Sequence, residues 1–241
     1  MSVTLADSPT CDAVAPERQR DWRYPVARWY LRPAAERLAR VLAPTRVRPV
    51  HLTVCGLIAA VVAAAVVLRL PEAMPAAAGL VLVYWFFDRA DGLLARRQQT
   101  ASPWGAWLDG NVDELVDLGL HVAVAAALAS QTAAIWPWWL LIAFLAGKYL
   151  LMYGLTLEES QGEGRGVRVQ GSGVRGNTGG TDTFLRRLYH LPGNADVRVH
   201  LLVAALLSGW LAAELVLVAV YYNLRWIARY VLVARRLGGV R

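Results

Sequence analysis

The sequence predicts an all-α, polytopic membrane protein with six transmembrane helices. Composition, the spacing of apolar stretches and the distribution of positive charge lead to this prediction. Of the 241 residues, 56% are hydrophobic and 18% are charged, whereas a soluble domain carries roughly 45–50% apolar and about 25% charged residues. With only two cysteines, the composition also excludes a disulfide scaffold, and its high apolar content excludes a disordered chain.

Six stretches are apolar enough to be transmembrane helices, each of which needs about 20 predominantly apolar residues. The fifth is short for a bilayer crossing. The predicted spans are His51–Leu70, Met74–Arg97, Gly105–Ser130, Ile135–Leu155, Asp196–Ser208 and Leu211–Arg236.

The positive charges set the predicted orientation. Nearly all of the 25 Lys and Arg residues precede residue 51, flank the turn after the second span, fall between the fourth and fifth spans, or lie from Arg225 onward. Only Arg69 lies on the opposite side, and Lys148 lies within the fourth span. The positive-inside rule therefore predicts a multi-pass protein of the cytoplasmic (inner) membrane with both termini in the cytoplasm.

The chain divides into an N-terminal segment, residues 1–50, and a six-helix membrane domain, residues 51–241. Aromatic and aliphatic side chains alternate with arginines over Asp21–Leu42. This pattern predicts an amphipathic interfacial helix on an anionic membrane surface, kinked or split by Pro25 and Pro33. An unstructured basic arm is the alternative. Residues 158–195 are predicted to form a cytoplasmic loop rich in Gly and Arg.

Four aspartates lie inside two neighbouring predicted spans, Asp88 and Asp91 in the second and Asp109 and Asp113 in the third. Residues three or four apart share a helix face, and the short connector makes the two helices antiparallel neighbours. Four unpaired acids within the membrane would cost on the order of 10 kcal/mol. The four carboxylates are therefore expected to converge on one cleft that opens to the cytoplasm.

Carboxylates crowded in this way need a cation to neutralise them. Oxygen ligands favour hard ions such as Mg²⁺ or Mn²⁺, and a pair of such ions is the standard arrangement for displacement at phosphorus. The sequence thus predicts two divalent ions and phosphoryl transfer. The alternative is structural pairing of the aspartates with nearby arginines.

These residues form a longer motif that resembles the signature of the CDP-alcohol phosphotransferases. All eight fixed positions are present with that family's spacing. They are Asp88, Asp91, Gly92, Ala95, Arg96, Gly105, Asp109 and Asp113. One departure precedes the first span, where many relatives have Pro-Asn-x-Leu/Ile-Thr and this chain has Pro49-Val50-His51-Leu52-Thr53.

The resemblance implies a role for each position of the motif. Asp88, Asp91 and Asp109 would hold one divalent ion, and Asp113 would join Asp88 and Asp109 at a second. Gly92, Ala95 and Arg96 would contact the cytidine diphosphate, and Gly105 would let the third helix pack near the nucleotide. Asp113 would be the catalytic general base. The resemblance also implies a homodimer, and we expect no nucleic acid among the partners.

The expected reaction transfers a substituted phosphate from a CDP-alcohol, with CDP-diacylglycerol favoured, to a small polar alcohol, and releases CMP. A phosphorylated acceptor would need cations, and Lys148, Arg198 and Arg225 are the candidates. Each has a structural alternative, which is snorkelling to the interface for Lys148 and positive-inside anchoring for the two arginines.

Two further interpretations stay open. In one, a soluble CDP-alcohol is the donor and a lipid or an inositol phosphate is the acceptor. In the other, the protein is a cation-coupled transporter whose acids line a pathway. Transporters commonly contain internal repeats and place their acids near the midplane, whereas no repeat is evident in this chain and its acids cluster toward one side.

Overall fold

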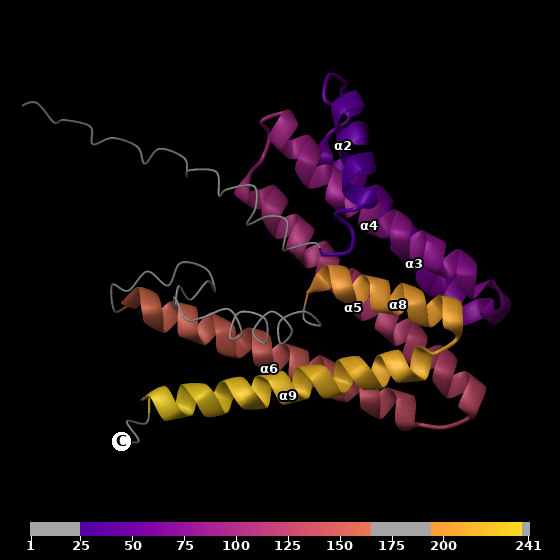
Figure 1. Ribbon diagram of the computed structural model, residues 1–241, viewed down its shortest axis with the longest axis vertical. Helices are drawn as coiled ribbons and strands as arrows, with labels where there is room; N and C mark the ends of the chain where they lie inside the picture. The colour runs from indigo at the N-terminus through magenta and orange to yellow at the C-terminus, as the bar shows by residue number, and fades with distance from the viewer. Residues whose placement is uncertain (1–24, 165–193, 238–241) are drawn as a thin grey trace, which may run out of the picture.

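The computed structural model describes residues 25–164 and 194–237, and the regular structure in these ranges is helical. The predicted all-α class is confirmed. The elements, labelled in Figure 1 where there is room, are α2 (Leu31–Leu42), α3 (Pro49–Arg69), the short 3₁₀ helix η1 (Pro71–Ala73), α4 (Met74–Arg97), α5 (Pro103–Thr132), α6 (Trp136–Gly164), α8 (Ala195–Ser208) and α9 (Leu211–Leu237).

Local sequence signals set several helix ends. Pro103 is the first residue of α5, and the hydroxyl of Ser102 accepts a hydrogen bond from the Gly105 N–H over 3.1 Å. Asn194 caps α8 in the same way, because its side-chain Oδ1 accepts a hydrogen bond from the Asp196 N–H over 2.9 Å. Gly209 ends α8 with φ of 76°, a conformation that glycine adopts without steric cost. The sharp turn between α8 and α9 therefore depends on this glycine.

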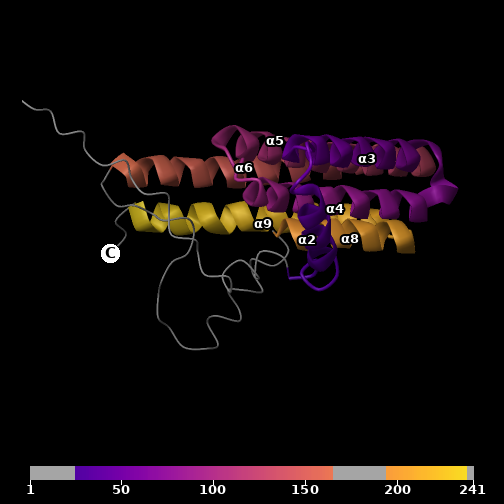
Figure 2. The same cartoon turned by 90° about the horizontal axis from the view of Figure 1, so that it is seen from above.

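The helices form two layers, with α3, α5 and α6 in one and α4, α8 and α9 in the other (Figure 2). Helix α3 packs against α4 and α5, α6 packs against α9, and α8 lies between α4 and α9. Helix α2 crosses α4 near the C-terminal end of α4 (Figure 1). The main core is apolar and includes Trp85, Phe144 and Leu215, each fully buried.

Each of the six predicted spans corresponds to one helix, and most ends agree within two residues. The exception is α6, which we predicted to end at Leu155 and which continues to Gly164, so the first residues of the predicted 158–195 loop are helical. The guanidinium of Arg229 on α9 donates to both carboxylate oxygens of Glu158, over 2.8 and 2.9 Å, and this ion pair stabilises the extension.

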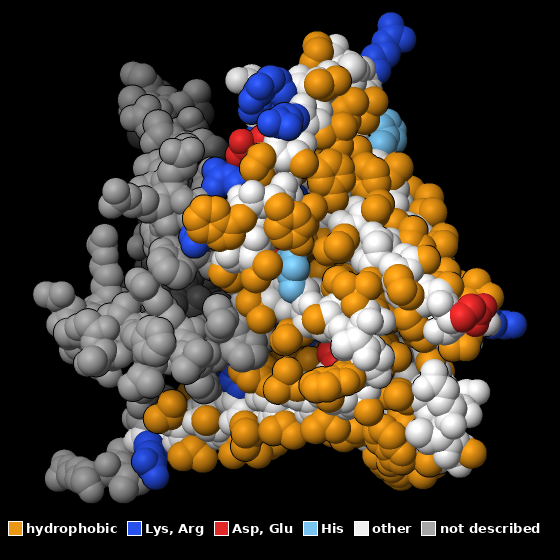
Figure 3. Space-filling model, turned by 45° about the vertical axis from the view of Figure 1, so that its right-hand side comes forward, with side chains coloured by type: hydrophobic (Ala, Val, Ile, Leu, Met, Phe, Trp, Pro, Cys, Tyr) orange, Lys and Arg blue, Asp and Glu red, His pale blue; other side chains and the backbone are white. Residues whose placement is uncertain are grey.

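Three of the described helices are long and apolar enough to cross a membrane by length and composition, namely Pro49–Arg69, Trp136–Glu158 and Leu211–Arg235. The six-span count and the cytoplasmic termini stay predictions. Exposed apolar side chains cover the outer face of α3, as expected for contact with lipid. They are Val54, Ile58, Val61, Val62 and Leu68. Hydrophobic side chains also cover most of the face seen in Figure 3, and basic side chains lie near its edges.

The N-terminal amphipathic helix is shorter than predicted. Residues 25–30 form turns, and α2 begins at Leu31, because Pro33 is tolerated only in the first turn of a helix. Leu31, Ala35 and Ala39 are buried along one face of α2, so this helix packs on the protein and leaves its arginines outward. Residues 21–24 of the predicted helix lie outside the described ranges.

Candidate active site

The aspartates predicted from the motif lie around one small pocket between α3, α4 and α5. Asp88, Asp109 and Asp113 offer carboxylate oxygens that all lie within 4.8 Å of one another, and no other such group of metal-ligating side chains occurs among the described residues. Asp91 lines the same pocket. The complete lining consists of Thr53, Gly56, Tyr84, Asp88, Asp91, Asp109, Val112 and Asp113.

Neighbouring hydroxyl groups orient two of the carboxylates. The Thr53 hydroxyl of α3 donates to Asp91 Oδ2 over 2.6 Å. The Tyr84 hydroxyl of α4 donates to Asp113 Oδ1, also over 2.6 Å. Thr53 belongs to the segment in which the family pattern is interrupted at Val50, but its own position in that pattern is retained. Sequence reasoning assigned no role to Thr53 or Tyr84.

Asp88 is paired with its neighbour Arg89, whose Nη2 lies 3.0 Å from Asp88 Oδ2. The Arg89 guanidinium in turn lies over the Trp85 ring, 4.0 Å from the ring centroid. This geometry supports in part the alternative of structural Asp–Arg pairing. One arginine cannot balance the four carboxylates of the pocket, so it does not replace a metal ion in neutralising the group.

The residues present fit a divalent cation. The donor set consists of carboxylate oxygens, the ligands that Mg²⁺ and Mn²⁺ prefer, and three of them already converge. The hydroxyl groups of Thr53 and Tyr84 hold Asp91 and Asp113, as outer groups commonly orient metal ligands. The cluster can therefore hold a divalent ion at the junction of three helices.

The motif residues predicted to contact the nucleotide lie along α4 and α5, outside the pocket lining. Gly92 and Ala95 follow Asp88 and Asp91 by one turn on the same face of α4. The Arg96 side chain folds back over Gly92, where a Cβ would lie 3.4 Å from Arg96 Nη1. Gly105 lies in the first turn of α5. Binding of the nucleotide by these residues stays a prediction.

Two of the three predicted acceptor cations meet one turn beyond Asp113, around the largely buried carboxylate of Asp117. The Nζ of Lys148 contacts Asp117 Oδ2 and lies 2.6 Å from Glu114 Oε2. Arg198 Nη1 lies 3.4 Å from Asp117 Oδ2 and also contacts the Tyr222 hydroxyl. Because the side chain of Lys148 is 9% exposed, it does not snorkel to an interface.

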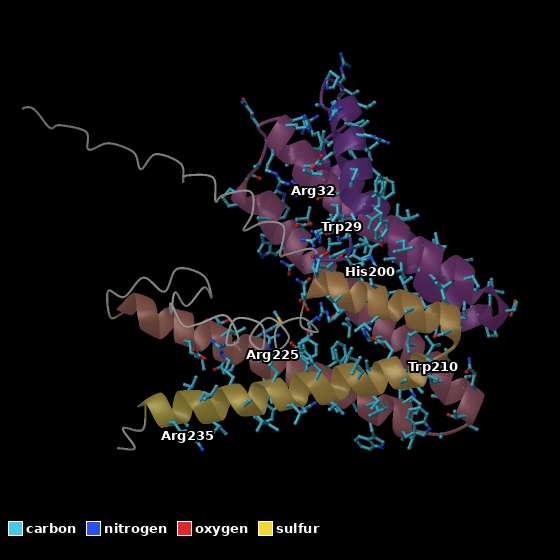
Figure 4. The ribbon with its side chains drawn as sticks, in the orientation of Figure 1. Trp29, Arg32, His200, Trp210, Arg225 and Arg235 are labelled. Atoms are coloured by element: carbon cyan, nitrogen blue, oxygen red, sulfur yellow. The ribbon has the colours of Figure 1, made fainter. Side chains whose placement is uncertain are left out.

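The third predicted cation, Arg225, is held separately. Its Nη1 donates to the Tyr221 hydroxyl over 2.7 Å. Figure 4 places it on α9, well away from Arg235 near the end of that helix. The structure thus brings Lys148 and Arg198 together and gives Arg225 no contact with Asp117.

The surroundings of Asp117 contain groups that sequence reasoning did not assign to a site. His121 Nδ1 lies 3.5 Å from Asp117 Oδ1, and His121 Nε2 lies 3.2 Å from Glu214 Oε1. The sequence could have indicated that Asp117 and His121 extend the aspartate cluster, because residues 109, 113, 117 and 121 are spaced four apart and follow one face of α5. Only the tertiary structure supplies Glu214 from α9.

Three comparisons place the chain among known proteins. The profile of the CDP-alcohol phosphatidyltransferase family matches residues 46–234. A bifunctional IPC transferase and DIPP synthase of Aquifex aeolicus (strain VF5) is 29% identical over 172 residues, which cover 69% of this chain and 35% of that protein. The chain therefore spans about a third of the length of that relative.

The fold is shared with a solved structure, that of Mycobacterium tuberculosis phosphatidylinositol phosphate synthase (PgsA1) with CDP-DAG bound. The TM-score is 0.53 at 22% sequence identity, over 83% of this chain and 93% of that chain. The family match includes the whole aspartate motif and most of the chain. The chain belongs to the CDP-alcohol phosphatidyltransferase family.

Proposed function

We propose that this enzyme transfers a substituted phosphate from a CDP-alcohol, with CDP-diacylglycerol as the favoured donor, to the hydroxyl of a small, phosphorylated alcohol, and releases CMP. The observation that carries the proposal is the convergence of oxygens from Asp88, Asp109 and Asp113 within 4.8 Å, near the largely buried cations of Lys148 and Arg198. The donor is supported by the family match and by the CDP-DAG bound in the PgsA1 structure.

The four motif aspartates would hold two divalent ions, Mg²⁺ or Mn²⁺. When bound, these ions would offset the negative charge of the donor's pyrophosphate. The assignment rests on the donor chemistry of the cluster and on the short, oriented contacts that hold Asp91 and Asp113.

Asp113 is the proposed general base. Its Oδ1 accepts the Tyr84 hydrogen bond, which orients the carboxylate. The acceptor hydroxyl oxygen forms a bond to the β-phosphorus of the donor, the bond from that phosphorus to the CMP oxygen breaks, and the hydroxyl proton passes to Asp113. A positioned base of this kind typically contributes 10²–10⁴-fold to the rate.

Binding of the two substrates is assigned to opposite sides of the carboxylates. Gly92, Ala95, Arg96 and Gly105 are proposed to take the cytidine diphosphate, because glycine and alanine allow a ligand close to a helix. Toward the interior of the bundle, Lys148 and Arg198 are proposed to take the phosphate of the acceptor, since a guanidinium suits bidentate phosphate binding. Arg225 is a less direct candidate because it contacts Tyr221.

We also propose that the active site faces the cytoplasm from the inner membrane, with both termini on that side, and that the enzyme is a homodimer. The strong bias of Lys and Arg toward one set of loops supports the orientation. The division into an N-terminal segment, residues 1–50, and a catalytic membrane domain, residues 51–241, is part of the same proposal.

The direct test is release of CMP by the purified protein with CDP-diacylglycerol, a panel of phosphorylated and unphosphorylated alcohols, and Mg²⁺ or Mn²⁺. We expect CMP only when an acceptor and a divalent ion are both present, and none after chelation with EDTA. Soluble CDP-alcohols with lipid or inositol-phosphate acceptors form a second arm. Absence of CMP from every pair, together with cation-dependent uptake into liposomes, would favour a transporter instead.

Asp113→Asn tests the base separately from binding. We expect turnover to be lost while binding of the CDP-alcohol partly survives, because the amide cannot accept the hydroxyl proton. Full activity of this variant would refute the assignment of Asp113.

A further inference from the structure

Lys148 lies between two carboxylates of unequal burial. Its Nζ is 2.6 Å from Glu114 Oε2 and also contacts Asp117 Oδ2. The side chain of Asp117 is 15% exposed, whereas that of Glu114 is 49% exposed. The Asp117 carboxylate is thus largely buried, whereas the Glu114 carboxylate contacts the same Lys148 Nζ from the surface of the bundle.

Asp117 has several partners that keep it in place. Lys148, Arg198 and His121 all contact its side chain, so its removal would leave buried cations without a counter-ion. The ion-pair partner of Glu114 among the described residues is Lys148. An entering anion would therefore displace the Glu114 carboxylate far more readily than that of Asp117, since the Glu114 side chain is about half exposed and has fewer partners to hold it.

Arg198 retains capacity to bind an anion. Its Nη1 contacts Tyr222 and lies 3.4 Å from Asp117, which is long for an ionic hydrogen bond. Its Nε is buried and has no hydrogen-bond partner among the described residues. A phosphate placed between Arg198 and Lys148 would supply the acceptor oxygens that both cations can use.

We infer that Glu114 occupies the position of the acceptor's phosphate when no acceptor is bound, and that it sets the preference between phosphorylated and unphosphorylated acceptors. A phosphorylated acceptor must displace the tethered carboxylate from Lys148, whereas an unphosphorylated one leaves the Lys148–Glu114 pair intact. This inference rests on the proposed function, because it assumes that Lys148 and Arg198 face the acceptor.

The test compares Glu114→Gln with the unaltered enzyme on matched acceptors. We would measure kcat/KM for CMP release with CDP-diacylglycerol and either inositol 1-phosphate or inositol, and again with glycerol 3-phosphate or glycerol. Loss of the competing charge should raise the acceptor ratio, which is kcat/KM with the phosphorylated acceptor divided by kcat/KM with the unphosphorylated one. We expect an increase of roughly fivefold, the size expected for one partly exposed ion pair. General damage near Asp113 affects both acceptors of a pair and cancels in the ratio.

Glu158→Gln is the matched control, because it removes the same charge from a partly exposed carboxylate that pairs with Arg229, away from the cluster. We expect the control to leave the ratio unchanged and Lys148→Gln to lower it. Inorganic phosphate provides a second probe. It should inhibit competitively against the acceptor, with an inhibition constant roughly fivefold lower in Glu114→Gln.

The outcomes separate the two proposals. An acceptor ratio and a phosphate inhibition constant that are both unchanged in Glu114→Gln, in an enzyme that releases CMP, would overturn the role of Glu114 and leave the proposed function standing. Failure of the unaltered enzyme to release CMP from any CDP-alcohol would instead overturn the proposed function itself.

Discussion

Trp85 and Asp196 are joined by a hydrogen bond in the interior of the protein, where the indole Nε1 of α4 donates to Asp196 Oδ1 of α8 over 3.0 Å. The Asp196 side chain is fully buried. It also accepts the backbone N–H groups of Val26 over 2.7 Å and of Ala27 over 3.1 Å. One carboxylate therefore ties α4, α8 and the turns before α2 together.

A neighbouring contact strengthens the same junction. The Tyr30 hydroxyl contacts His200 Nε2, and Figure 4 labels His200 on α8. The guanidinium of Arg89, the partner of Asp88, lies over the ring of Trp85. The anchoring of the N-terminal segment is thus only a few side chains away from the carboxylate cluster.

Trp85→Phe should destabilise the protein, because it removes one N–H donor from a buried carboxylate and keeps an aromatic ring beneath Arg89. A buried acceptor that loses a donor costs about 1–3 kcal/mol. Thermal unfolding in detergent would show a lower midpoint. Trp139→Phe is the control, since Trp139 is 62% exposed, and equal midpoints for the two variants would contradict the importance of the Asp196 bond.

Tyr84→Phe should slow turnover. The variant loses only the hydroxyl that donates to Asp113 Oδ1, and a hydrogen bond to a charged group contributes about 1.5–3 kcal/mol, so a decrease of roughly tenfold or more in kcat is expected. The KM for the CDP-alcohol should change little. Tyr153→Phe, at an exposed tyrosine, should match the unaltered enzyme, and an unchanged kcat in Tyr84→Phe would show that Asp113 is positioned by other contacts.

Thr53→Val should raise the concentration of Mg²⁺ or Mn²⁺ needed for half-maximal activity. Valine preserves the shape of threonine but cannot donate to Asp91 Oδ2, and loss of a group that orients a metal ligand typically costs 10–100-fold in metal affinity. Metal titration of CMP release is the measurement. Thr132→Val serves as the control, because the Thr132 hydroxyl donates to the Leu128 carbonyl of its own helix. Identical titrations for both would argue against Asp91 as a ligand.

Gly147→Ala should weaken the packing of α6 on α9. A Cβ at residue 147 would lie 2.9 Å from the backbone N of Asn223, whose side chain donates to the Ala143 carbonyl over 2.7 Å. Overpacking of this kind costs about 1–3 kcal/mol, so the thermal midpoint should fall. Gly79→Ala meets nothing within 4 Å and should be neutral or slightly stabilising. A similar midpoint for the two variants would count against close α6–α9 packing.

The sequence by itself determined the class of the fold, the positions of the helices and the core of the candidate site. Long apolar stretches predict helices because a chain in lipid must satisfy its backbone hydrogen bonds internally. Asp88, Asp91, Asp109 and Asp113 could be placed on shared faces because helical spacing is regular. The signal was weaker for the end of α6, where the distant ion pair between Glu158 and Arg229 decides the boundary.

Only the tertiary structure decided which distant side chains support that site. Thr53 meets Asp91 across 38 positions of sequence, Tyr84 meets Asp113 across 29, and Trp85 meets Asp196 across 111. The contacts around Asp117 likewise join α5, α6, α8 and α9. Such contacts depend on how the helices rotate and pack against one another, and no local periodicity encodes that rotation.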